Sequence, residues 1–212
     1  MRAVPTVFVV DDDDSVRRAL RRLIQSVGLT VRTHASAAEF LAAYDANMPG
    51  CLVLDVRMPG LSGLDLQASF TERDITLPVI FITGHGDIPM SVRAMKAGAL
   101  DFLAKPFNDQ VLLDAIQRAL AQDAEARRER AERDSVARRL ESLTPRERQV
   151  MSRIVCGLTN RQVAAELGAS EKTIKVHRAR VMRKTQVNSL AELVLLAQAA
   201  GIRTPKVQST YA

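Results

Sequence analysis

The stretch that most constrains the fold is an apolar run that ends on a carboxylate and then breaks at Pro-Gly. Residues 51–54 read Cys-Leu-Val-Leu, and Asp55 follows them, four residues before Pro59. A short, continuous run of β-branched and aliphatic residues is typical of a strand buried on both faces of a parallel sheet. Asp55 then lies at the carboxyl end of that strand, where open α/β sheets bind their ligands.

Other apolar runs also stop at a polar residue. The residues that follow the runs 6–10, 78–82 and 101–104 are, in that order, Asp11 with Asp12, Thr83, and Lys105. If these strands are parallel neighbours, carboxylates, a hydroxyl and an ammonium meet in one crevice. Clustered carboxylates repel one another and normally require a divalent cation, and hard oxygen ligands favour Mg²⁺. The metal and the ammonium together would stabilise a phosphoryl group on a carboxylate.

Helical patterns alternate with these strands through the first 120 residues. Asp14 is the predicted cap of a first helix that ends at Gly28, and residues 30–33 form a short strand expected at the sheet edge. Further helices are predicted over residues 37–44, 62–70 and 89–97, and from Asn108 onward. This order predicts an α/β doubly wound, five-stranded parallel sheet with right-handed crossovers.

A charged segment separates this half from the rest of the chain. The apolar stripe of the helix that starts at Asn108 stops after Ala121, and residues 121–142 carry six acidic and six basic side chains. Ala, Glu and Arg favour helix, and acid–base pairs recur at i, i+4 spacing. We interpret residues 121–141 as a long, solvated linker helix.

The second half shows clear helix boundaries. Thr144 with Pro145 and Glu147 forms a capping box, and Ser189 with Glu192 is a second candidate box. Between them, Thr159 and Ser170 are the predicted caps of two helices separated by a turn at Gly168. Four short helices with a glycine-centred turn between the second and third predict an all-α, four-helix helix-turn-helix domain.

Charge is divided unevenly between the halves. Residues 1–120 carry 12 Lys and Arg against 14 Asp and Glu, whereas residues 121–212 carry 18 against 10. The basic half therefore favours a polyanionic partner, although charge alone is weak evidence for one.

A basic stripe on the third helix of the second half sharpens this expectation. Ile174 and Val181 face inward at helical spacing. The opposite face carries Lys172, Lys175, Val176, Ala179, Arg180 and Arg183. Such a stripe suits the phosphates and guanine edges of a DNA major groove, with apolar side chains against thymine methyls. On an isolated helix, the alternative is an ordinary solvated face of Lys and Arg.

Four segments together resemble the receiver domain of bacterial two-component response regulators, and more narrowly the FixJ-like branch. In chain order they are Val9-Val10-Asp11-Asp12, Asp55-Val56-Arg57-Met58-Pro59-Gly60, Thr83-Gly84-His85-Gly86-Asp87 and Lys105-Pro106-Phe107. Each segment alone is weak evidence, but the set is specific and covers roughly the first 120 residues. The resemblance implies a flavodoxin-like receiver in which Asp55 accepts a phosphoryl group. It also implies that Mg²⁺ is held by Asp11, Asp12, Asp55 and the backbone carbonyl of Arg57.

The same resemblance implies a switch next to the acceptor. Thr83 and Lys105 are expected to contact the phosphoryl group, and Phe102 is expected to turn inward when that group captures Thr83. His85 occupies the place where family members tune the loss of phosphate, and it is equally consistent with an exposed loop residue. In this family, phosphorylation promotes a homodimer through the face made by the fourth helix and the fifth strand.

Four segments of the second half look like the LuxR-type DNA-binding domain, over about residues 140–200. They are Leu143-Thr-Pro-Arg-Glu-Arg-Gln-Val, Gly157-Leu-Thr-Asn-Arg-Gln-Val-Ala, Leu167-Gly-Ala-Ser-Glu-Lys-Thr-Ile-Lys-Val-His-Arg and Ser189-Leu-Ala-Glu-Leu. This resemblance favours the DNA interpretation of the basic stripe. The DNA contacts that it implies are Lys172, Thr173, Lys175, Val176, Arg180, Arg183 and Lys184. Family members often have a polar base-reading residue where this chain has Ala179.

These observations predict a phosphorylation-gated transcription activator. Its predicted domains are a receiver over residues 1–120, a charged helical linker over 121–141, a LuxR-type helix-turn-helix domain over 142–204 and a flexible tail over 205–212. Its expected partners are a cognate sensor histidine kinase, promoter DNA, RNA polymerase and a second copy of the chain. The first ten residues lack a signal-peptide core and no apolar run reaches about 18 residues, so we predict a cytoplasmic protein with no membrane partner.

Two alternatives and the cysteines complete the prediction. The first alternative is a phosphotransferase or phosphatase, but haloacid-dehalogenase-type phosphatases have a second Asp where this chain has Arg57. The second is a binding module that ignores phosphate. The acid pair, Thr83 and Lys105 argue against it, and labelling by acetyl phosphate with Mg²⁺ discriminates the two. Cys51 and Cys156 each lie in an apolar segment, which indicates core packing rather than a disulfide or a metal site.

Overall fold

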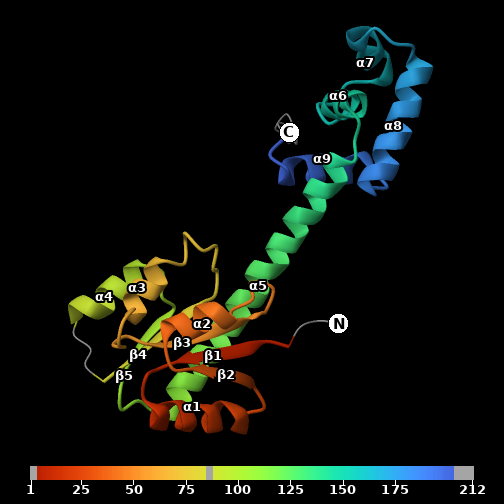
Figure 1. Cartoon of the computed structure of the whole chain (residues 1–212). Helices are drawn as coiled ribbons and strands as arrows, with labels where there is room; N and C mark the ends of the chain where they lie inside the picture. The colour runs from red at the N-terminus through yellow and green to blue at the C-terminus, as the bar shows by residue number, and fades with distance from the viewer. Residues whose placement is uncertain (1–3, 85–87, 203–212) are drawn as a thin grey trace, which may run out of the picture. The chain divides into compact units, whose positions relative to one another are not determined.

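The computed structural model of the chain describes residues 4–84 and 88–202. His85 and the predicted flexible tail therefore lie outside the described residues. The chain divides into two compact units, Met1–Arg127 and Arg128–Ala212 (Figure 1). Among the described helices, none is long and apolar enough to cross a membrane.

The first unit is built on a parallel sheet. Its strands, within the described residues, are β1 (Thr6–Val10), β2 (Thr30–His34), β3 (Gly50–Asp55), β4 (Val79–Thr83) and β5 (Asp101–Ala104). They are all parallel and follow the order β2-β1-β3-β4-β5, so β2 lies at the sheet edge as predicted. Every residue of β1, β3 and β4 is buried, as expected for continuous apolar runs covered on both faces. The predicted doubly wound fold is confirmed.

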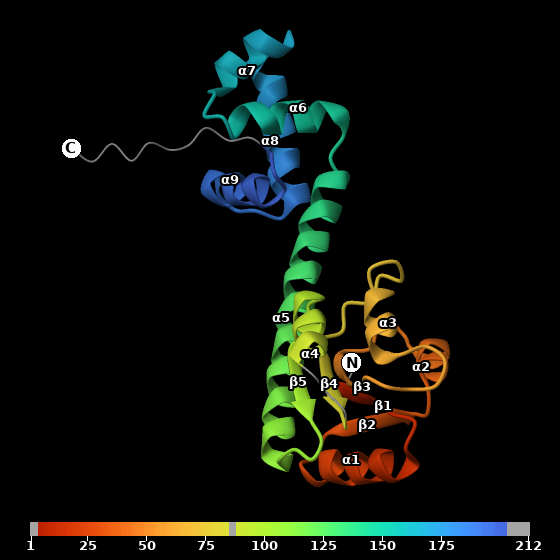
Figure 2. The same ribbon diagram turned by 90° about the vertical axis from the view of Figure 1, so that its left-hand side faces the viewer.

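Helices cover both faces of this sheet (Figure 2). They are α1 (Asp14–Ser26), α2 (Ala37–Ala43), α3 (Gly63–Ala68), α4 (Ile88–Lys96) and α5 (Asp109–Glu141). One core packs α2, α3 and α4 against the sheet through Phe40, Leu66 and Ala94. The other core packs α1 and the start of α5 through Ile24 and Ile116. This arrangement leaves the carboxyl ends of the strands at one edge, with loops around them.

The predicted cap of the first helix is wrong by one residue. Asp13, with φ −80° and ψ 114°, is the N-cap, and its side chain accepts hydrogen bonds from the backbone N–H groups of Ser15 and Val16. Asp14 instead lies in the first turn of α1 and pairs with Arg17 and Arg18. Four consecutive aspartates offer several caps of equal chemistry, so only backbone geometry selects among them.

The long helix α5 also departs from the prediction. It runs without a break from Asp109 to Glu141, so the predicted long helix is present. The solvated environment predicted from residue 121 is wrong at Asp123, which is buried, and at Arg127, whose guanidinium is bound to the loop before β3. The reason is that Asp123 accepts a hydrogen bond from the backbone N–H of Gly50.

Up to residue 202, where the described part of the chain ends, the second unit contains the end of α5 and four further helices. These are α6 (Pro145–Ile154), α7 (Asn160–Leu167), α8 (Glu171–Thr185) and α9 (Leu190–Ala199), packed around a core that includes Val150, Ile174 and Leu193. Thr144 forms the predicted capping box with Glu147. Gly168 ends α7 at φ 61°, which explains why glycine stands in the turn before α8. The predicted helix-turn-helix arrangement is confirmed.

The predicted second capping box and the predicted positions of the two cysteines can be compared with the structure. Ser189 caps α9, but Glu192 accepts its hydrogen bond from Asn188, not from Ser189, so the box is not reciprocal. Cys51 is buried as predicted, and burial raises the pKa of its thiol to about 12. Cys156 is exposed, and its predicted core position is wrong. The preceding Val155, the C-cap of α6, is buried, whereas Cys156 follows the end of that helix and is not.

Candidate functional site

The carboxyl ends of β1 and β3 bring two aspartates together. Val10 pairs with Leu54 in the parallel register, so the next residues, Asp11 and Asp55, lie side by side at the sheet edge. The Lys105 ammonium, which follows β5, lies 2.6 Å from Asp11 Oδ2 and 2.9 Å from Asp55 Oδ1. Both carboxylates are buried. The predicted meeting of acid and ammonium is therefore present in the fold.

The second oxygen of each carboxylate is held by a backbone amide. Asp11 Oδ1 accepts a hydrogen bond of 2.9 Å from the N–H of Asp13, and Asp55 Oδ2 accepts one of 2.7 Å from the N–H of Arg57. Each carboxylate is therefore fixed through one oxygen by the adjoining loop and through the other by Lys105. Such double anchoring sets the orientation of both groups before any ligand arrives.

Burial and charge act in opposite directions at this pair. Burial raises the pKa of Asp55 above its usual range, and the hydrogen bond from Lys105 opposes that rise. Burial also disfavours the charged form of Lys105, but hydrogen bonds to Asp11 and Asp55 outweigh it and raise the pKa of the ammonium. A charged lysine between two carboxylates is the expected consequence.

Thr83 and Phe102 lie on the next two strands. Thr83 is the buried last residue of β4, one position beyond Ile82, which pairs with Asp55. The backbone N–H of Lys105 donates to the Thr83 carbonyl at 2.7 Å, which ties the end of β4 to the residue that follows β5. Phe102 on β5 is half-buried, with its ring centroid 6.1 Å from that of Phe81.

The third predicted acid stands apart. Asp12 is exposed, and so is Arg57, whose backbone carbonyl was the fourth predicted metal ligand. Across the part of the chain that the structure describes, no group of three or more His, Cys, Asp or Glu side chains is arranged to hold a metal ion. The structure thus brings together Asp11, Asp55 and Lys105, and leaves Asp12 at the rim.

Glycine 63 extends the site into the following helix. The N–H of Gly63, the first residue of α3, donates to the Val56 carbonyl at 3.0 Å. A Cβ atom at this position would collide with the backbone carbonyl oxygen of Asp55. The sequence analysis did not single out Gly63, although the glycine directly after a capping serine was a visible signal.

Most of the predicted DNA-contacting residues lie on one exposed side of α8. Ile174 and Val181, two helical turns apart, are buried and mark the inward side of α8. The predicted contacts that are exposed are Lys172, Thr173, Lys175, Val176, Arg180 and Arg183. Ala179 lies within the same exposed set. An exposed basic helix that follows a tight turn has the geometry of a recognition helix.

Lys184 differs from the other predicted contacts. Its ammonium lies 2.7 Å from Glu147 Oε2 and 3.0 Å from the Ser142 carbonyl oxygen. Glu147 is buried, and the hydrogen bond from Lys184 lowers the pKa of its carboxyl to about 2. Lys184 therefore joins the end of α8 to the start of α6, an internal role that the family resemblance did not predict.

Comparison with known families agrees with this geometry. Residues 7–117 match the response regulator receiver domain, and residues 141–197 match the luxR family of bacterial regulatory proteins. The chain is 50% identical to nodulation protein W of Bradyrhizobium diazoefficiens, over 96% of this chain and 90% of that protein. It is 48% identical to the transcriptional regulatory protein FixJ of Azorhizobium caulinodans, over 92% and 93%. The chain belongs to the two-component response regulators.

Solved structures of other response regulators resemble this one over most of its length. It is similar to the response regulator StyR, with 52% identity and a TM-score of 0.89 over 92% of this chain and 99% of that chain. It is also similar to full-length FixJ from B. japonicum, with 44% identity and a TM-score of 0.57 over 95% and 100%. The response regulator thus combines a receiver domain with a LuxR-type DNA-binding domain and regulates transcription. Its family comprises DNA-binding regulators and not enzymes, which removes the phosphatase alternative.

Proposed function

We propose that a cognate sensor histidine kinase phosphorylates Asp55 and that phosphorylation promotes dimerisation and binding to promoter DNA. The observation that carries this proposal is the Lys105 ammonium between Asp11 and Asp55, at 2.6 Å and 2.9 Å. A fixed ammonium beside a buried carboxylate stabilises the charge that phosphoryl transfer places there. Both acids are buried, and Asp55, which ends β3, is the less deeply buried of the two, at 6% exposure against 1% for Asp11.

The transfer itself requires little from the protein besides positioning. An Asp55 carboxylate oxygen attacks phosphorus, the bond between phosphorus and the donor atom breaks, and the donor leaves with that electron pair. Lys105 then contacts the phosphoryl oxygens, and Thr83 lies one residue beyond the strand partner of Asp55 to meet another. The phosphate on Asp55 would draw in Thr83 and allow Phe102 to turn inward.

The crevice also fits a magnesium ion chemically. Mg²⁺ prefers oxygen ligands, keeps several waters and is usually held by only one or two carboxylates together with phosphate oxygens. Asp11 and Asp55 supply two buried carboxylates, and the carbonyl of Arg57 and the exposed Asp12 lie in the adjoining loops. When bound, the ion would neutralise phosphoryl charge. We therefore propose Asp11, Asp12, Asp55 and the Arg57 carbonyl as its ligands.

The surface of α4 supports dimerisation. Ile88, Val92 and Met95 are 80%, 44% and 47% exposed, which gives a single helix three exposed apolar side chains. Apolar side chains gathered on one exposed face mark an interaction surface. Asp101 at the start of β5 already has an intrachain partner in Arg118, so the apolar side chains of α4 carry this proposal.

For the output half, we propose the exposed side of α8 as the DNA-reading surface. The proposed contacts are Lys172, Thr173, Lys175, Val176, Arg180 and Arg183. Lys184 is left out because its ammonium is bound to Glu147 and to the Ser142 carbonyl.

We place the end of the receiver domain at Arg127, where the first compact unit ends, and not at residue 120. The regulator would work in the cytoplasm, where bacterial promoters lie, and activate transcription through RNA polymerase.

Labelling by acetyl phosphate with Mg²⁺ tests the acceptor. We expect Asp55→Asn to abolish labelling, because only its carboxylate forms the acyl phosphate. Asp114→Asn, an exposed aspartate on α5, is the matched control and should label like the wild type.

Sedimentation tests dimerisation: the wild type should be a monomer alone and a dimer with beryllofluoride. Labelling of Asp55→Asn at the wild-type rate would refute the assignment, and an unchanged mass with beryllofluoride would refute phosphate-driven dimerisation.

Footprinting on promoter DNA at several salt concentrations tests the output surface. Lys175→Ala should change sequence preference, whereas Arg183→Ala should weaken all sequences alike and flatten the salt dependence. Arg153→Ala, a basic residue outside α8 that pairs with Glu166, is the control. Equal losses for all three variants would show that the DNA surface lies elsewhere.

A further inference from the structure

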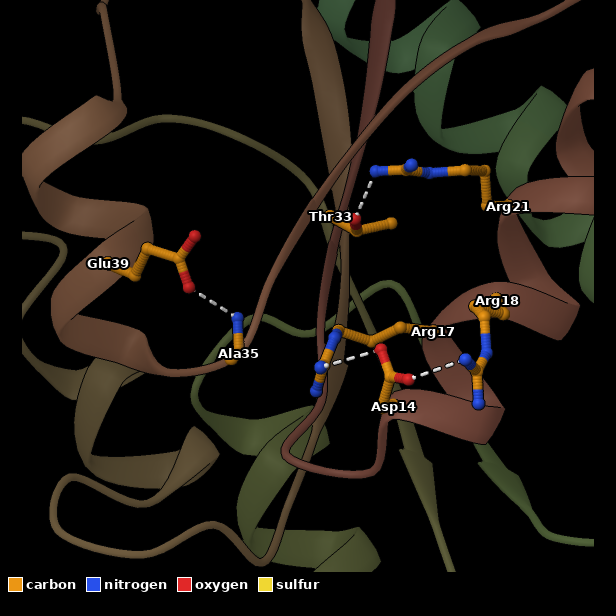
Figure 3. A pocket seen from close by; sticks show the side chains of 7 residues that line it. All are labelled: Asp14, Arg17, Arg18, Arg21, Thr33, Ala35 and Glu39. Carbon is orange, nitrogen blue, oxygen red and sulfur yellow. Dashed lines mark hydrogen bonds and ion pairs between the residues drawn. The ribbon is translucent and has the colours of Figure 1, made fainter.

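Arg17 makes an unusual set of contacts beneath the acidic loop. Its Nη1 donates to the backbone carbonyls of Asp11, at 2.7 Å, and Asp12, at 2.9 Å. Its Nη2 donates to Asp14 Oδ1 at 3.1 Å, a contact that Figure 3 shows together with the neighbouring Arg18. The side chain of Arg17 is only 16% exposed. One guanidinium thus holds the backbone of two of the proposed metal ligands.

These two carbonyls lie at a break in regular structure. They follow β1, which ends at Val10, and precede α1, which begins at Asp14. Backbone carbonyls in such a break lack ladder or helix partners and need another donor when they are shielded from water. Arg17 is that donor for the part-buried carbonyl of Asp11, it also binds the exposed carbonyl of Asp12, and it comes from the helix that the loop leads into.

The loop is also where negative charge accumulates. Four aspartates follow one another at residues 11–14, and consecutive carboxylates repel one another. Arg17 places a positive charge against the backbone of the first two and against the side chain of Asp14. Arg18 pairs with Asp14 as well, at 3.0 Å, but it is 66% exposed. The two neighbouring arginines therefore share one acid but differ in whether they reach the loop.

The geometry points to Arg17 as a positioning residue that fixes the acidic loop for Mg²⁺, an inference that rests on the proposed phosphorylation of Asp55. The planar guanidinium fork holds both carbonyls through Nη1 and Asp14 through Nη2, an arrangement that the single nitrogen of a lysine ammonium reproduces poorly. The loop then delivers Asp11 to Lys105 and holds Asp11 Oδ1 on the N–H of Asp13. Without the fork, the ion must order the loop as it binds.

The test compares three full-length variants in isothermal titration with Mg²⁺. Removal of a partner that orients metal ligands typically weakens metal affinity 10–100-fold. We expect Arg17→Met to weaken Mg²⁺ affinity by about tenfold, in line with the low end of that range. Arg18→Met, which removes the exposed neighbour, should match the wild type. Arg17→Lys should also bind more weakly than the wild type, because it keeps the charge and loses the fork.

A second readout separates positioning from folding. The Mg²⁺ concentration that gives half-maximal labelling by acetyl phosphate should rise in Arg17→Met, while the labelling rate at saturating Mg²⁺ stays near that of the wild type. If Arg17→Met and Arg17→Lys bind Mg²⁺ like Arg18→Met, the inference is overturned. If Arg17→Met does not fold, the comparison of Mg²⁺ affinity between Arg17→Lys and Arg18→Met tests the inference by the same criterion. A wild-type protein that binds Mg²⁺ but is not labelled would instead refute the proposed function.

Discussion

Two acid–arginine pairs occupy helix α5 at the same i, i+4 spacing, one on each side of the boundary between the two units. In the first, Arg127 Nε lies 2.8 Å from Asp123 Oδ2, and the Asp123 side chain is 3% exposed. In the second, Arg133 Nη2 lies 3.1 Å from Glu129 Oε2, and the side chains are 72% and 56% exposed. The two pairs have the same spacing along the helix, but the acid of the first is buried and both side chains of the second are exposed.

The buried pair, Asp123 with Arg127, also binds backbone groups at and before the start of β3. Asp123 Oδ2 accepts the N–H of Gly50, the first residue of β3, at 2.9 Å. Arg127 donates to the carbonyls of Ala46, at 3.1 Å, and Met48, at 2.7 Å. The first pair thus joins α5 to the loop that leads into the acceptor strand. The comparison teaches that identical helical spacing yields either an anchor or a solvated pair, depending on what lies beside the helix.

Breaking the buried pair should produce the largest effect. Asp123→Ala leaves the Arg127 guanidinium without its carboxylate and the Gly50 N–H without its acceptor. Loss of one partner of a buried ion pair costs about 3–5 kcal/mol, and the Arg127 side chain, 26% exposed, puts this pair at the low end of that range. We expect the receiver domain to lose stability by that amount, measured as faster native-state hydrogen exchange of β3 amides. Asp134→Ala, an exposed acid on the same helix, is the control. Equal exchange in the two variants would contradict the anchoring role.

The Glu147–Lys184 pair extends the comparison to the second unit, with a smaller expected effect. Lys184→Met removes the ammonium but leaves Glu147 the backbone N–H of Thr144 as a donor. Because a hydrogen bond to a charged group contributes about 1.5–3 kcal/mol, we expect a loss of about that size. Hydrogen exchange of α6 amides measures it, and Lys172→Met is the exposed control. An equally stable Lys184→Met protein would show that this pair behaves like the exposed one.

Acid should reproduce part of that loss. The pKa of Glu147 is lowered from 4.5 to about 2, so its contribution to stability is complete above about pH 4.5 and is lost as the pH falls toward 2. The effect should be smaller than that of Lys184→Met, because the lysine side chain stays in place. Thermal unfolding of wild type and Glu147→Gln between pH 5 and pH 2 checks it. Parallel pH profiles for the two proteins would exclude Glu147 as the titrating group.

The exposed pair should respond least. Glu129→Ala removes a solvent-accessible i, i+4 ion pair, and such pairs contribute about 0.3–0.5 kcal/mol. We expect a change in the free energy of unfolding at that level, and less at high salt because exposed charges are screened. Denaturant unfolding with and without added salt measures the change. A loss as large as that of Asp123→Ala would abolish the distinction between the two pairs.

The strands and the acceptor crevice were predictable because apolar content and parallel topology act together. Runs such as residues 51–54 have one stable place, buried between two helical layers, and the polar residue that ends each run must then emerge at the carboxyl edge. Asp55, Asp11 and Lys105 meet for this reason. The capping box at Thr144 was equally predictable, since its donors and acceptors lie within four residues of chain.

Polar anchors escaped prediction because their partners are backbone groups. Arg17 binds the carbonyls of Asp11 and Asp12, and Arg127 binds carbonyls more than seventy residues away in the chain. Every residue has a carbonyl, so the sequence does not indicate which one a guanidinium will reach. Lys184 shows the same limit, because the family resemblance predicted a DNA contact there, whereas its ammonium is bound to Glu147 and to the Ser142 carbonyl.

The packing of Gly63 against Asp55 has a consequence for how this chain tolerates variation. Any side chain at position 63 would meet the carbonyl oxygen of the acceptor, and that oxygen belongs to backbone, which cannot swing aside as a flexible side chain does. Alanine there would push on the acceptor through the main chain, without touching its carboxylate. In a saturation library selected for signalling, substitutions should therefore be rejected at position 63 as they are at Asp55, although Gly63 lies eight residues further along the chain and has no reactive group.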